Sequence, residues 1–258
     1  MMKVHVGTSG YSYKEWKGSF YPEDLAADGM LEYYASRFTT VEINNTFYRM
    51  PKTSVVEGWR DTVPASFQFV IKASRRITHM KRIKNVEEEV AYFLEVTSAL
   101  GDKQGPMLFQ LPPNLKKDLE RLDAFLALLP SDRRSVMEFR HDSWLDDEVF
   151  DRLRGAGVAL CHTDAGKVKK KGDDEAEAEA AVADGEPTPI VATAGFGYFR
   201  LRDDLYDDAG LDAWAARVLE QPFEETYVFF KHEDEGKGPD FAARFRGRLE
   251  AGGAAASG

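Results

Sequence analysis

Short apolar runs alternate with longer amphipathic segments along the whole chain. Eight runs rich in β-branched and aromatic residues predict strands at 3–8, 40–44, 67–72, 107–111, 135–140, 158–162, 197–202 and 226–231. Segments with helical periodicity predict helices at 30–38, 54–62, 86–100, 116–129, 146–155, 211–220 and 240–250. Strands that alternate with helices are typical of βα units, and eight units predict an α/β fold, a single parallel eight-stranded (β/α)8 barrel of the TIM type.

The connection between the sixth and seventh predicted strands lacks a convincing amphipathic helix. Residues 167–189, KVKKKGDDEAEAEAAVADGEPTP, contain four lysines followed by an acidic, alanine-rich run without large apolar side chains. This composition cannot bury enough surface to hold itself in place, so it predicts a disordered, solvated acidic insertion. An interaction arm or a lid over the barrel is the alternative. Residues 251–258 are predicted to be a flexible tail, which leaves residues 1–250 as one barrel domain.

Alternation along the strands identifies the side chains that point into the barrel. Glu42 lies between Val41 and Ile43, so its carboxylate faces the side opposite to theirs, where it is costly unless it is paired or used. Active sites of parallel barrels lie at the carboxyl ends of the strands. The polar residues that alternation places inward at this end are Glu42, Asn44, Lys72, Gln110, Glu138, Arg140, His162, Asp164, Arg200, Arg202 and Lys231.

Cations outnumber carboxylates in this set. Lys72, Arg140, Arg200 and Lys231 face Glu42 and Glu138 in an otherwise acidic protein. Arginine and lysine bind oxyanions, so the set predicts a pocket for a phosphate, carboxylate or sulfate group. A network in which these residues pair only with one another is the structural alternative. A divalent metal held by His162, Asp164 and the two glutamates is a second alternative, but the favoured interpretation needs neither a metal nor another cofactor.

Two loops add aromatic and basic side chains near this end of the barrel. The loop GTSGYSYKEWKGSFYP after the first strand offers Ser9 and Tyr11, and the second strand is followed by Asn44 and Tyr48. These residues join the predicted substrate-binding set, although the aromatic rings of the first loop could equally pack beneath it. The run ASRRITHMKRIK after the third strand is either a phosphate-contacting patch or a solvated loop face.

Composition narrows the classes of partner. The chain has 258 residues with 34 basic and 44 acidic side chains, and its net charge of -10 disfavours nucleic acid as the default partner. Cys161 is the only cysteine, which excludes an intramolecular disulfide. The chain contains no apolar run long enough for a membrane span and begins without a leader, so the expectation is a soluble, cytoplasmic protein. Motifs for nucleotide-dependent phosphoryl transfer, dinucleotide binding, zinc proteases and serine hydrolases are absent.

Several stretches in order carry a resemblance to a known family. These are GTSGYSYKEWKGSFYP, TVEINNTFYRMP, FVIKASRRITH, GPMLFQLPP, SVMEFRHDSW, and YFRLR followed by LYDDAGLDAW, which together run from Val4 to about Ala243. They resemble the YecE-like family of TIM-barrel proteins of unknown function, and the resemblance implies a TIM barrel without a defined reaction. The positions that match the family's recurring residues include Glu42, Lys72, Gln110, Glu138, Arg140 and Arg200. The chain departs from the family pattern at 201–204 and 230–233.

The leading functional hypothesis is an enzyme, a hydrolase or lyase, that acts on a small anionic substrate such as a sugar phosphate, a nucleotide phosphate or a glycoside. Glu42 and Glu138 would act as general acid and base. Ser9, Tyr11, Asn44, Tyr48, Lys72, Gln110, Arg140, Arg200 and Lys231 would bind the substrate. The alternatives are a protein that binds or processes nucleic acid, and a non-catalytic ligand-binding or scaffold barrel.

Overall fold

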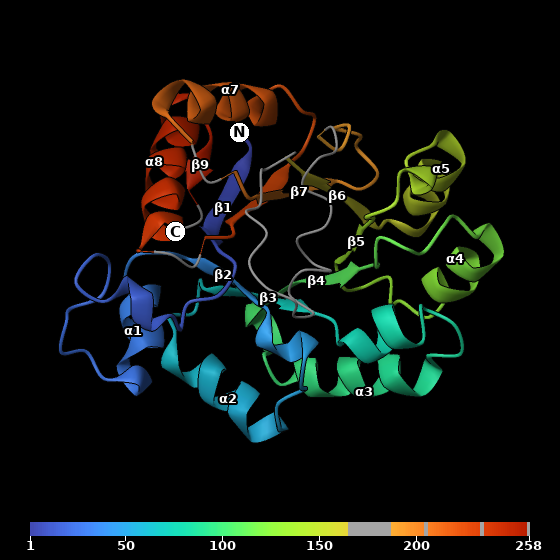
Figure 1. The fold of residues 1–258 in the computed structure, drawn as a ribbon, viewed down its shortest axis with the longest axis horizontal. Helices are drawn as coiled ribbons and strands as arrows, with labels where there is room; N and C mark the ends of the chain where they lie inside the picture. Colours follow the sequence, from blue (N-terminus) through green and yellow to red (C-terminus); the bar gives the residue numbers. More distant parts are fainter. Residues whose placement is uncertain (165–186, 204–205, 233–234, 257–258) are drawn as a thin grey trace.

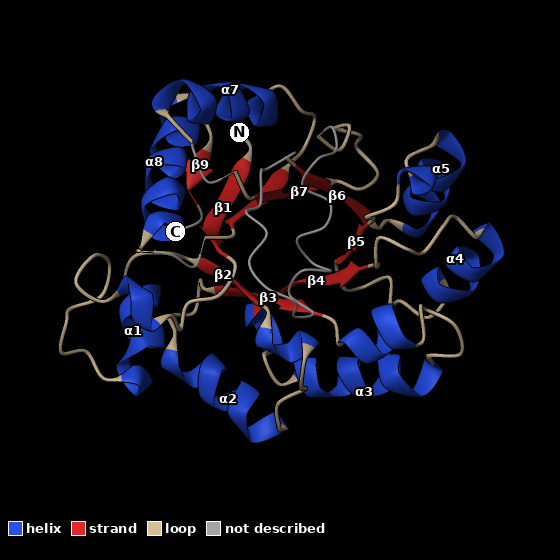
Figure 2. Ribbon diagram, viewed as in Figure 1, coloured by secondary structure: helices blue, strands red, loops and turns tan. Residues whose placement is uncertain are grey.

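The computed structural model describes residues 1–164, 187–203, 206–232 and 235–256. Eight parallel strands form a nearly closed barrel (Figure 2), in the order β2-β3-β4-β5-β6-β7-β8-β1. Their bounds are β1 Lys3–Thr8, β2 Thr40–Ile43, β3 Gln68–Lys72, β4 Gln104–Gln110, β5 Ser135–Glu138, β6 Ala159–Thr163, β7 Phe196–Leu201 and β8 Glu225–Phe230. The predicted eight-stranded parallel barrel is therefore confirmed.

The barrel closes where β1 meets β2. The two strands are joined by one bridge between Ser9 and Glu42, and the Gly10 N–H donates a hydrogen bond of 2.7 Å to the Glu42 carbonyl. A Cβ atom on Gly7 would lie 2.3 Å from the carbonyl oxygen of Thr40, so this close approach requires glycine. The same closure brings Glu42 beside the loop that follows β1.

Helices surround the barrel (Figure 1). Their bounds are α1 Met30–Ala35, α2 Thr53–Thr62, α3 Glu87–Ser98, α4 Leu119–Leu126, α5 Asp147–Ala156, α7 Asp208–Leu219 and α8 Lys237–Ala251. Asp118, Asp146 and Asp207 cap α4, α5 and α7, because each carboxylate accepts a backbone N–H from the first turn. α5 ends at Gly157, whose φ of 65° is the left-handed conformation that glycine adopts without strain.

Two apolar layers hold the fold together. The larger lies between the strands and the helices and includes Val41, Ile43 and Phe109. The smaller fills the interior of the barrel with inward-facing side chains from β3 to β8, among them Val70, Leu108 and Val136. Aromatic rings of β7 and β8 belong to the inner layer and fill the middle of the barrel. Polar side chains are thereby displaced toward the two ends of the strands.

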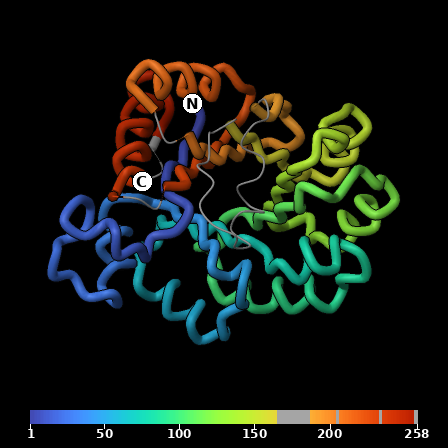
Figure 3. The backbone as a smooth tube through the Cα atoms, viewed as in Figure 1, coloured from blue at the N-terminus to red at the C-terminus, as the bar shows by residue number. Residues whose placement is uncertain are grey.

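The chain after α8 continues into a short strand within the segment 251–258. Ala251 is the last residue of α8, and Ala255–Ala256 form the short strand β9, which pairs in parallel with Lys3 and Val4 of β1. The first and last parts of the described chain therefore lie side by side (Figure 3). The predicted insertion at 167–189 lies almost entirely outside the described residues, which resume at 187.

Candidate functional site

Glu42 of β2 lies where β1 meets β2 and is fully buried. Its Oε1 accepts hydrogen bonds from Ser9 Oγ at 2.7 Å and Asn44 Nδ2 at 3.2 Å, and Arg200 Nη2 donates to the same oxygen at 2.8 Å. Its Oε2 accepts a hydrogen bond of 2.5 Å from the Tyr198 hydroxyl. The carboxylate that looked anomalous in an apolar strand is therefore satisfied on both oxygens.

Arg200 of β7 joins the two glutamates. Its guanidinium is fully buried, and Nη1 donates to Glu138 Oε2 at 2.7 Å while Nη2 contacts Glu42. Nη1 also donates to Gln110 Oε1 at 3.2 Å. Because one planar group contacts both carboxylates, the guanidinium occupies the space between them.

Glu138 of β5 receives two further guanidinium groups. Arg140 Nε lies 2.6 Å and Arg202 Nη2 lies 2.8 Å from its Oε1. The side chain of Arg140 is 2% exposed and that of Arg202 10%, so solvent screens these charges weakly. Three arginines thus converge on a single buried carboxylate.

The surroundings keep both carboxyl groups ionised. Burial by itself would raise the pKa of Glu138, but the charges of Arg140, Arg200 and Arg202 outweigh burial and hold that pKa well below its ordinary value of 4.5. For Glu42, burial is again opposed, by the charge of Arg200 and by hydrogen bonds, and the pKa is lowered. A carboxyl group with a lowered pKa carries no proton to donate near neutral pH.

Lys72 and Gln110 complete the inner surface of this site. The Lys72 side chain is buried, and its Nζ lies 4.2 Å from the centroid of the Phe47 ring. Gln110 is 1% exposed, and its Nε2 has no hydrogen-bond partner within the described part of the chain. Arg202 Nε is likewise a buried donor without a described partner. These donors are the unsatisfied polar atoms that a bound acceptor would satisfy.

Positive charge exceeds negative charge in the buried part of this site. In the described residues, the buried cationic side chains are Lys72, Arg140, Arg200 and Arg202, and the buried carboxylates are Glu42 and Glu138. The eight residues Glu42, Lys72, Gln110, Glu138, Arg140, Tyr198, Arg200 and Arg202 are called the charged cluster below. Asn44 and Ser9 border it through their hydrogen bonds to Glu42.

For three predicted substrate-binding residues, the described contacts do not involve Glu42 or Glu138. The Tyr11 ring packs 6.2 Å from that of Tyr34, and no described hydrogen bond joins its hydroxyl to the charged cluster. Tyr48 is 51% exposed on the rim, under the guanidinium of Arg75. Lys231 follows β8, where its backbone N–H donates to the Leu201 carbonyl, and its side chain is half-buried.

The predicted inward orientation of His162 is wrong. Ala159 and Cys161 are the β6 side chains in the inner layer, so His162 points outward, 4.8 Å from the Phe199 ring, and its Nδ1 contacts the Pro189 carbonyl. Burial lowers its pKa to about 4. Small side chains suit the crowded interior, which fixes the opposite phase for this strand.

Asp164 follows β6 and holds the end of β7. Its carboxylate accepts the backbone N–H groups of Arg202 and Asp203 at 2.9–3.0 Å. Burial raises its pKa to about 6. In the described residues, no group of three or more His, Cys, Asp and Glu side chains is arranged to hold a metal ion.

Tyr198 and Arg202 were missing from the predicted catalytic and substrate-binding residues, although alternation had placed Arg202 inward. Both alternate with Arg200 along β7, and this periodicity was the signal that could have added them to the site. Their partners lie far away in the sequence, since Tyr198 contacts Glu42 and Arg202 contacts Glu138. Only the closed barrel brings these positions together.

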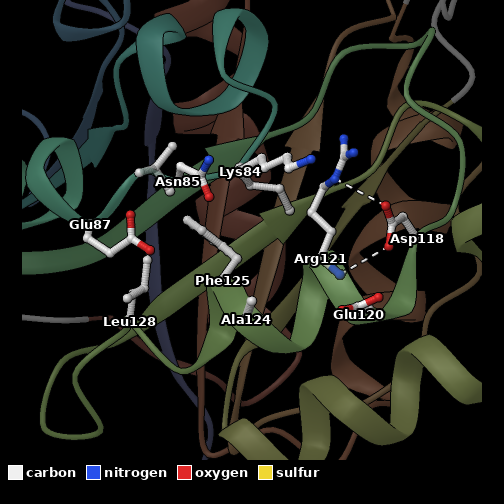
Figure 4. A pocket seen from close by; sticks show the side chains of 11 residues that line it. Lys84, Asn85, Glu87, Asp118, Glu120, Arg121, Ala124, Phe125 and Leu128 are labelled. Atoms are coloured by element: carbon white, nitrogen blue, oxygen red, sulfur yellow. Dashed lines mark hydrogen bonds and ion pairs between the residues drawn. The ribbon is translucent and has the colours of Figure 1, made fainter.

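The hollows described on the outside of the barrel do not coincide with the charged cluster. One of about 290 Å³ is formed by the segment before α3 and by α4 (Figure 4), and it is lined by Lys84, Asn85 and Arg121 among others. Arg121 is held there by Asp118, with Nε 3.2 Å from the carboxylate. None of its lining residues belongs to the charged cluster.

No described helix is long and apolar enough to cross a membrane.

Comparison with known proteins places the chain in a family. A family model described as "Protein of unknown function DUF72" matches residues 5–257. The chain is 35% identical over 139 residues to UPF0759 protein YecE of Escherichia coli, covering 54% of this chain and 48% of YecE. It is 27% identical over 157 residues to UPF0759 protein YunF of Bacillus subtilis, covering 58% of this chain and 55% of YunF. The matches therefore span about half the length of these relatives.

Solved structures agree with this placement. The crystal structure of a DUF72 family protein (TM1631) from Thermotoga maritima has a TM-score of 0.81 and 27% identity, covering 97% of this chain and all of that one. A DUF72 family protein (EF0366) from Enterococcus faecalis has a TM-score of 0.75, with 97% and 98% coverage, and at 18% identity it supports the fold alone. The chain belongs to the DUF72 family of proteins of unknown function, which includes the YecE-like proteins that its sequence resembles.

Proposed function

We propose that the charged cluster is the binding site for the anionic group of a small substrate, a phosphate, sulfate or carboxylate. The observation that carries this proposal is the convergence of three buried arginines on two buried carboxylates, with Lys72 buried as well. Two buried donors, Gln110 Nε2 and Arg202 Nε, have no described partner and would be satisfied by an oxyanion. Their position at the carboxyl ends of the strands is where parallel barrels keep their active sites.

The arrangement favours catalysis by charge stabilisation over catalysis by a pair of glutamates. A preformed array of arginines stabilises negative charge that develops on a substrate, and low dielectric strengthens this effect. Glu42 and Glu138 then act as positioning residues that orient the guanidinium groups. Both have lowered pKa values, which disfavours the general acid role proposed from the sequence.

Glycoside hydrolysis is the least supported of the proposed reactions. That chemistry needs space for a glycosidic oxygen or a water molecule between two carboxyl groups. Here the guanidinium of Arg200 contacts Glu42 and Glu138 together, so it occupies that space. A phosphorylated or otherwise oxyanionic metabolite fits the site better than a neutral glycoside.

Thermal unfolding with and without inorganic phosphate tests the proposal. A ligand that binds only the folded protein raises the melting temperature in a saturable manner. Phosphate also stabilises proteins non-specifically by its exclusion from their surfaces, so the informative quantity is the difference between wild type and Arg202→Gln. Arg134→Gln, which changes an exposed arginine at the opposite end of the barrel, is the matched control.

The expected result is a saturable phosphate effect in the wild type and in Arg134→Gln, and a weaker effect in Arg202→Gln. Calorimetric titration with phosphate, sulfate and citrate should likewise show weaker binding to Arg202→Gln than to the wild type and to Arg134→Gln. Identical responses of all three proteins to all three anions would refute anion binding at the charged cluster.

A further inference from the structure

A line of stacked side chains leads from the charged cluster to the surface. Lys72 Nζ lies 4.2 Å from the Phe47 ring centroid, and the Phe47 ring lies 5.1 Å from the Tyr48 ring, nearly perpendicular to it. The Arg75 guanidinium lies 5.9 Å from the Tyr48 ring centroid. Phe47 is 7% exposed, whereas Tyr48 is 51% exposed. The line therefore ends in a solvent-accessible aromatic ring one residue away from the ring that contacts Lys72.

Two loops hold this line in place. Phe47 belongs to the short helix η3 (Asn45–Phe47) after β2, and Thr46 Oγ1 donates to the Lys72 carbonyl at 2.7 Å, which fastens η3 to the end of β3. Arg75 directly precedes η4 (Arg76–Met80), a π-helical turn, and the His79 ring packs 4.8 Å from Phe47. π-helical turns are rare in proteins, and those that occur often lie at functional sites.

The backbone after this π-helical turn is also unusual. Arg82 and Ile83 have φ values of 52° and 56°, and a positive φ is strained for a β-branched residue such as Ile83. The buried Ile83 side chain and its N–H, which donates to the Ile77 carbonyl at 2.8 Å, hold this conformation. The segment that carries Arg75 is therefore held in one shape, in keeping with a preformed binding surface.

We infer that the substrate is a nucleotide unit, whose phosphate binds the charged cluster while its base stacks on Tyr48. This inference rests on the proposed anion site. An exposed tyrosine offers a planar face to any base, and base–aromatic stacking does not depend on sequence. The Arg75 guanidinium, which lies over the same ring, adds positive charge beside a stacked base. A sugar phosphate without a base would make no stacking contact with the exposed Tyr48 ring.

The nucleotide unit can be free or can stand at the end of a single strand. The overall charge of -10 favours the free form, since a long polyanion would be repelled by the rest of the surface. The basic residues near η4, among them Arg76, Lys81 and Arg82, would be the contacts for a strand. Arg76 and Lys81 already pair with Glu89, which reduces their availability.

Calorimetric titrations of four proteins test this inference. Wild type, Tyr48→Phe, Tyr48→Ala and Tyr92→Ala are each titrated with adenosine 5′-monophosphate, ribose 5-phosphate, inorganic phosphate and adenosine. Tyr92 is the matched control because it is a tyrosine with the same exposure of 51% on α3. A 5′-phosphorylated trinucleotide, titrated at two salt concentrations, distinguishes a free nucleotide from the end of a strand.

Stacking of one base predicts that wild type binds the nucleotide roughly 5- to 100-fold more tightly than ribose 5-phosphate. Tyr48→Ala should abolish this preference without changing phosphate affinity, while Tyr48→Phe and Tyr92→Ala should retain it. Equal affinity for the nucleotide and ribose 5-phosphate, or a preference that survives in Tyr48→Ala, would overturn the inference and leave the anion site intact. No binding of any phosphate compound would overturn both.

Discussion

The two ends of the barrel contain ion-pair clusters of similar composition in different surroundings. At the amino end, Glu225 accepts a hydrogen bond of 2.6 Å from His5 Nε2 and forms ion pairs with Arg134 Nη2 at 2.5 Å and Lys3 Nζ at 3.5 Å. The side chains of Lys3 and Arg134 are 53% and 46% exposed. At the carboxyl end, Arg200 and both glutamates are fully buried. In the described ion pairs of each end, cations outnumber carboxylates.

The two clusters differ in how far solvent screens their charges. Water and salt screen the surplus charge of exposed side chains, so the amino end needs no further partner. A buried surplus is screened far less, and it favours any anion that can reach it. The comparison therefore supports the proposed division, with stability at the amino end and ligand binding at the carboxyl end, which is the usual one in parallel barrels.

Removal of one arginine from each end should give the largest contrast. Arg200→Met leaves Glu42 without an ionic partner in the described residues, and an orphaned buried charge costs about 3–5 kcal/mol of unfolding free energy. Arg134→Met removes a half-exposed arginine and should cost about 1 kcal/mol or less. Urea unfolding at pH 7 measures both values.

A double variant separates the orphaned charge from lost packing. Arg200→Met combined with Glu42→Gln should recover a substantial part of the loss, because the buried carboxylate is then neutral. Equal losses from Arg200→Met and Arg134→Met, or no recovery in the double variant, would contradict the distinction between the two ends.

Acidification should weaken the amino end before the carboxyl end. Burial lowers the pKa of His5 below its ordinary value of 6.5, against the opposing effect of Glu225, and Lys3 and Arg134 lower it further. The unfolded chain then binds a proton that the folded protein does not, so the stability from neutral His5 is lost as pH falls below 6.5. Glu42 and Glu138 have pKa values below 4.5, so their contribution is present above 4.5 and is lost only below it.

Urea unfolding of wild type and His5→Phe between pH 5 and 8 isolates this effect. Phenylalanine can keep the stacking on Tyr227, whose ring lies 4.4 Å from that of His5, but cannot titrate. The wild-type free energy of unfolding should fall more steeply below pH 6.5, by at most about 1.4 kcal/mol per pH unit for one proton. His162 titrates in both proteins and does not affect the difference. Parallel curves would show that His5 does not govern this window.

Local patterns predicted the fold and most of the charged cluster. Apolar side chains on either side of Glu42 leave one orientation for the glutamate, and the same logic placed Gln110, Glu138 and Arg200 inside the barrel. The strand β6 has the sequence ALCHT, and its small alanine and cysteine side chains fit either face of the sheet. Its phase was therefore open to error, and His162 was assigned to the wrong side.

Contacts between distant parts of the chain were beyond local patterns. The hydrogen bond from Tyr198 to Glu42 joins residues 156 positions apart. Asn85 directly precedes the predicted helix at 86–100, where asparagine commonly caps a helix, but its φ is 52° and the observed N-cap is Val86, without a side-chain hydrogen bond. Tertiary packing around Ile83 outweighs the local capping preference at this point.

Two lysines, one at each end, provide the finest test of the comparison. Lys72→Met replaces a buried ammonium with an apolar side chain of similar length, while Glu42 and Glu138 keep their arginine partners. No carboxylate of the described residues is orphaned, and the lost cation–π contact with Phe47 is offset by the avoided cost of burying a charge. The free energy of unfolding should therefore change by less than about 1 kcal/mol.

Lys3→Met should change stability equally little, for the opposite reason that its charge is already in water. The two variants should differ in phosphate binding, because only Lys72 lies in the charged cluster. Loss of one charge-assisted contact predicts roughly tenfold weaker binding in Lys72→Met and no change in Lys3→Met. A large destabilisation by Lys72→Met would show that Lys72 balances the glutamates, and the buried surplus of positive charge would no longer distinguish the carboxyl end.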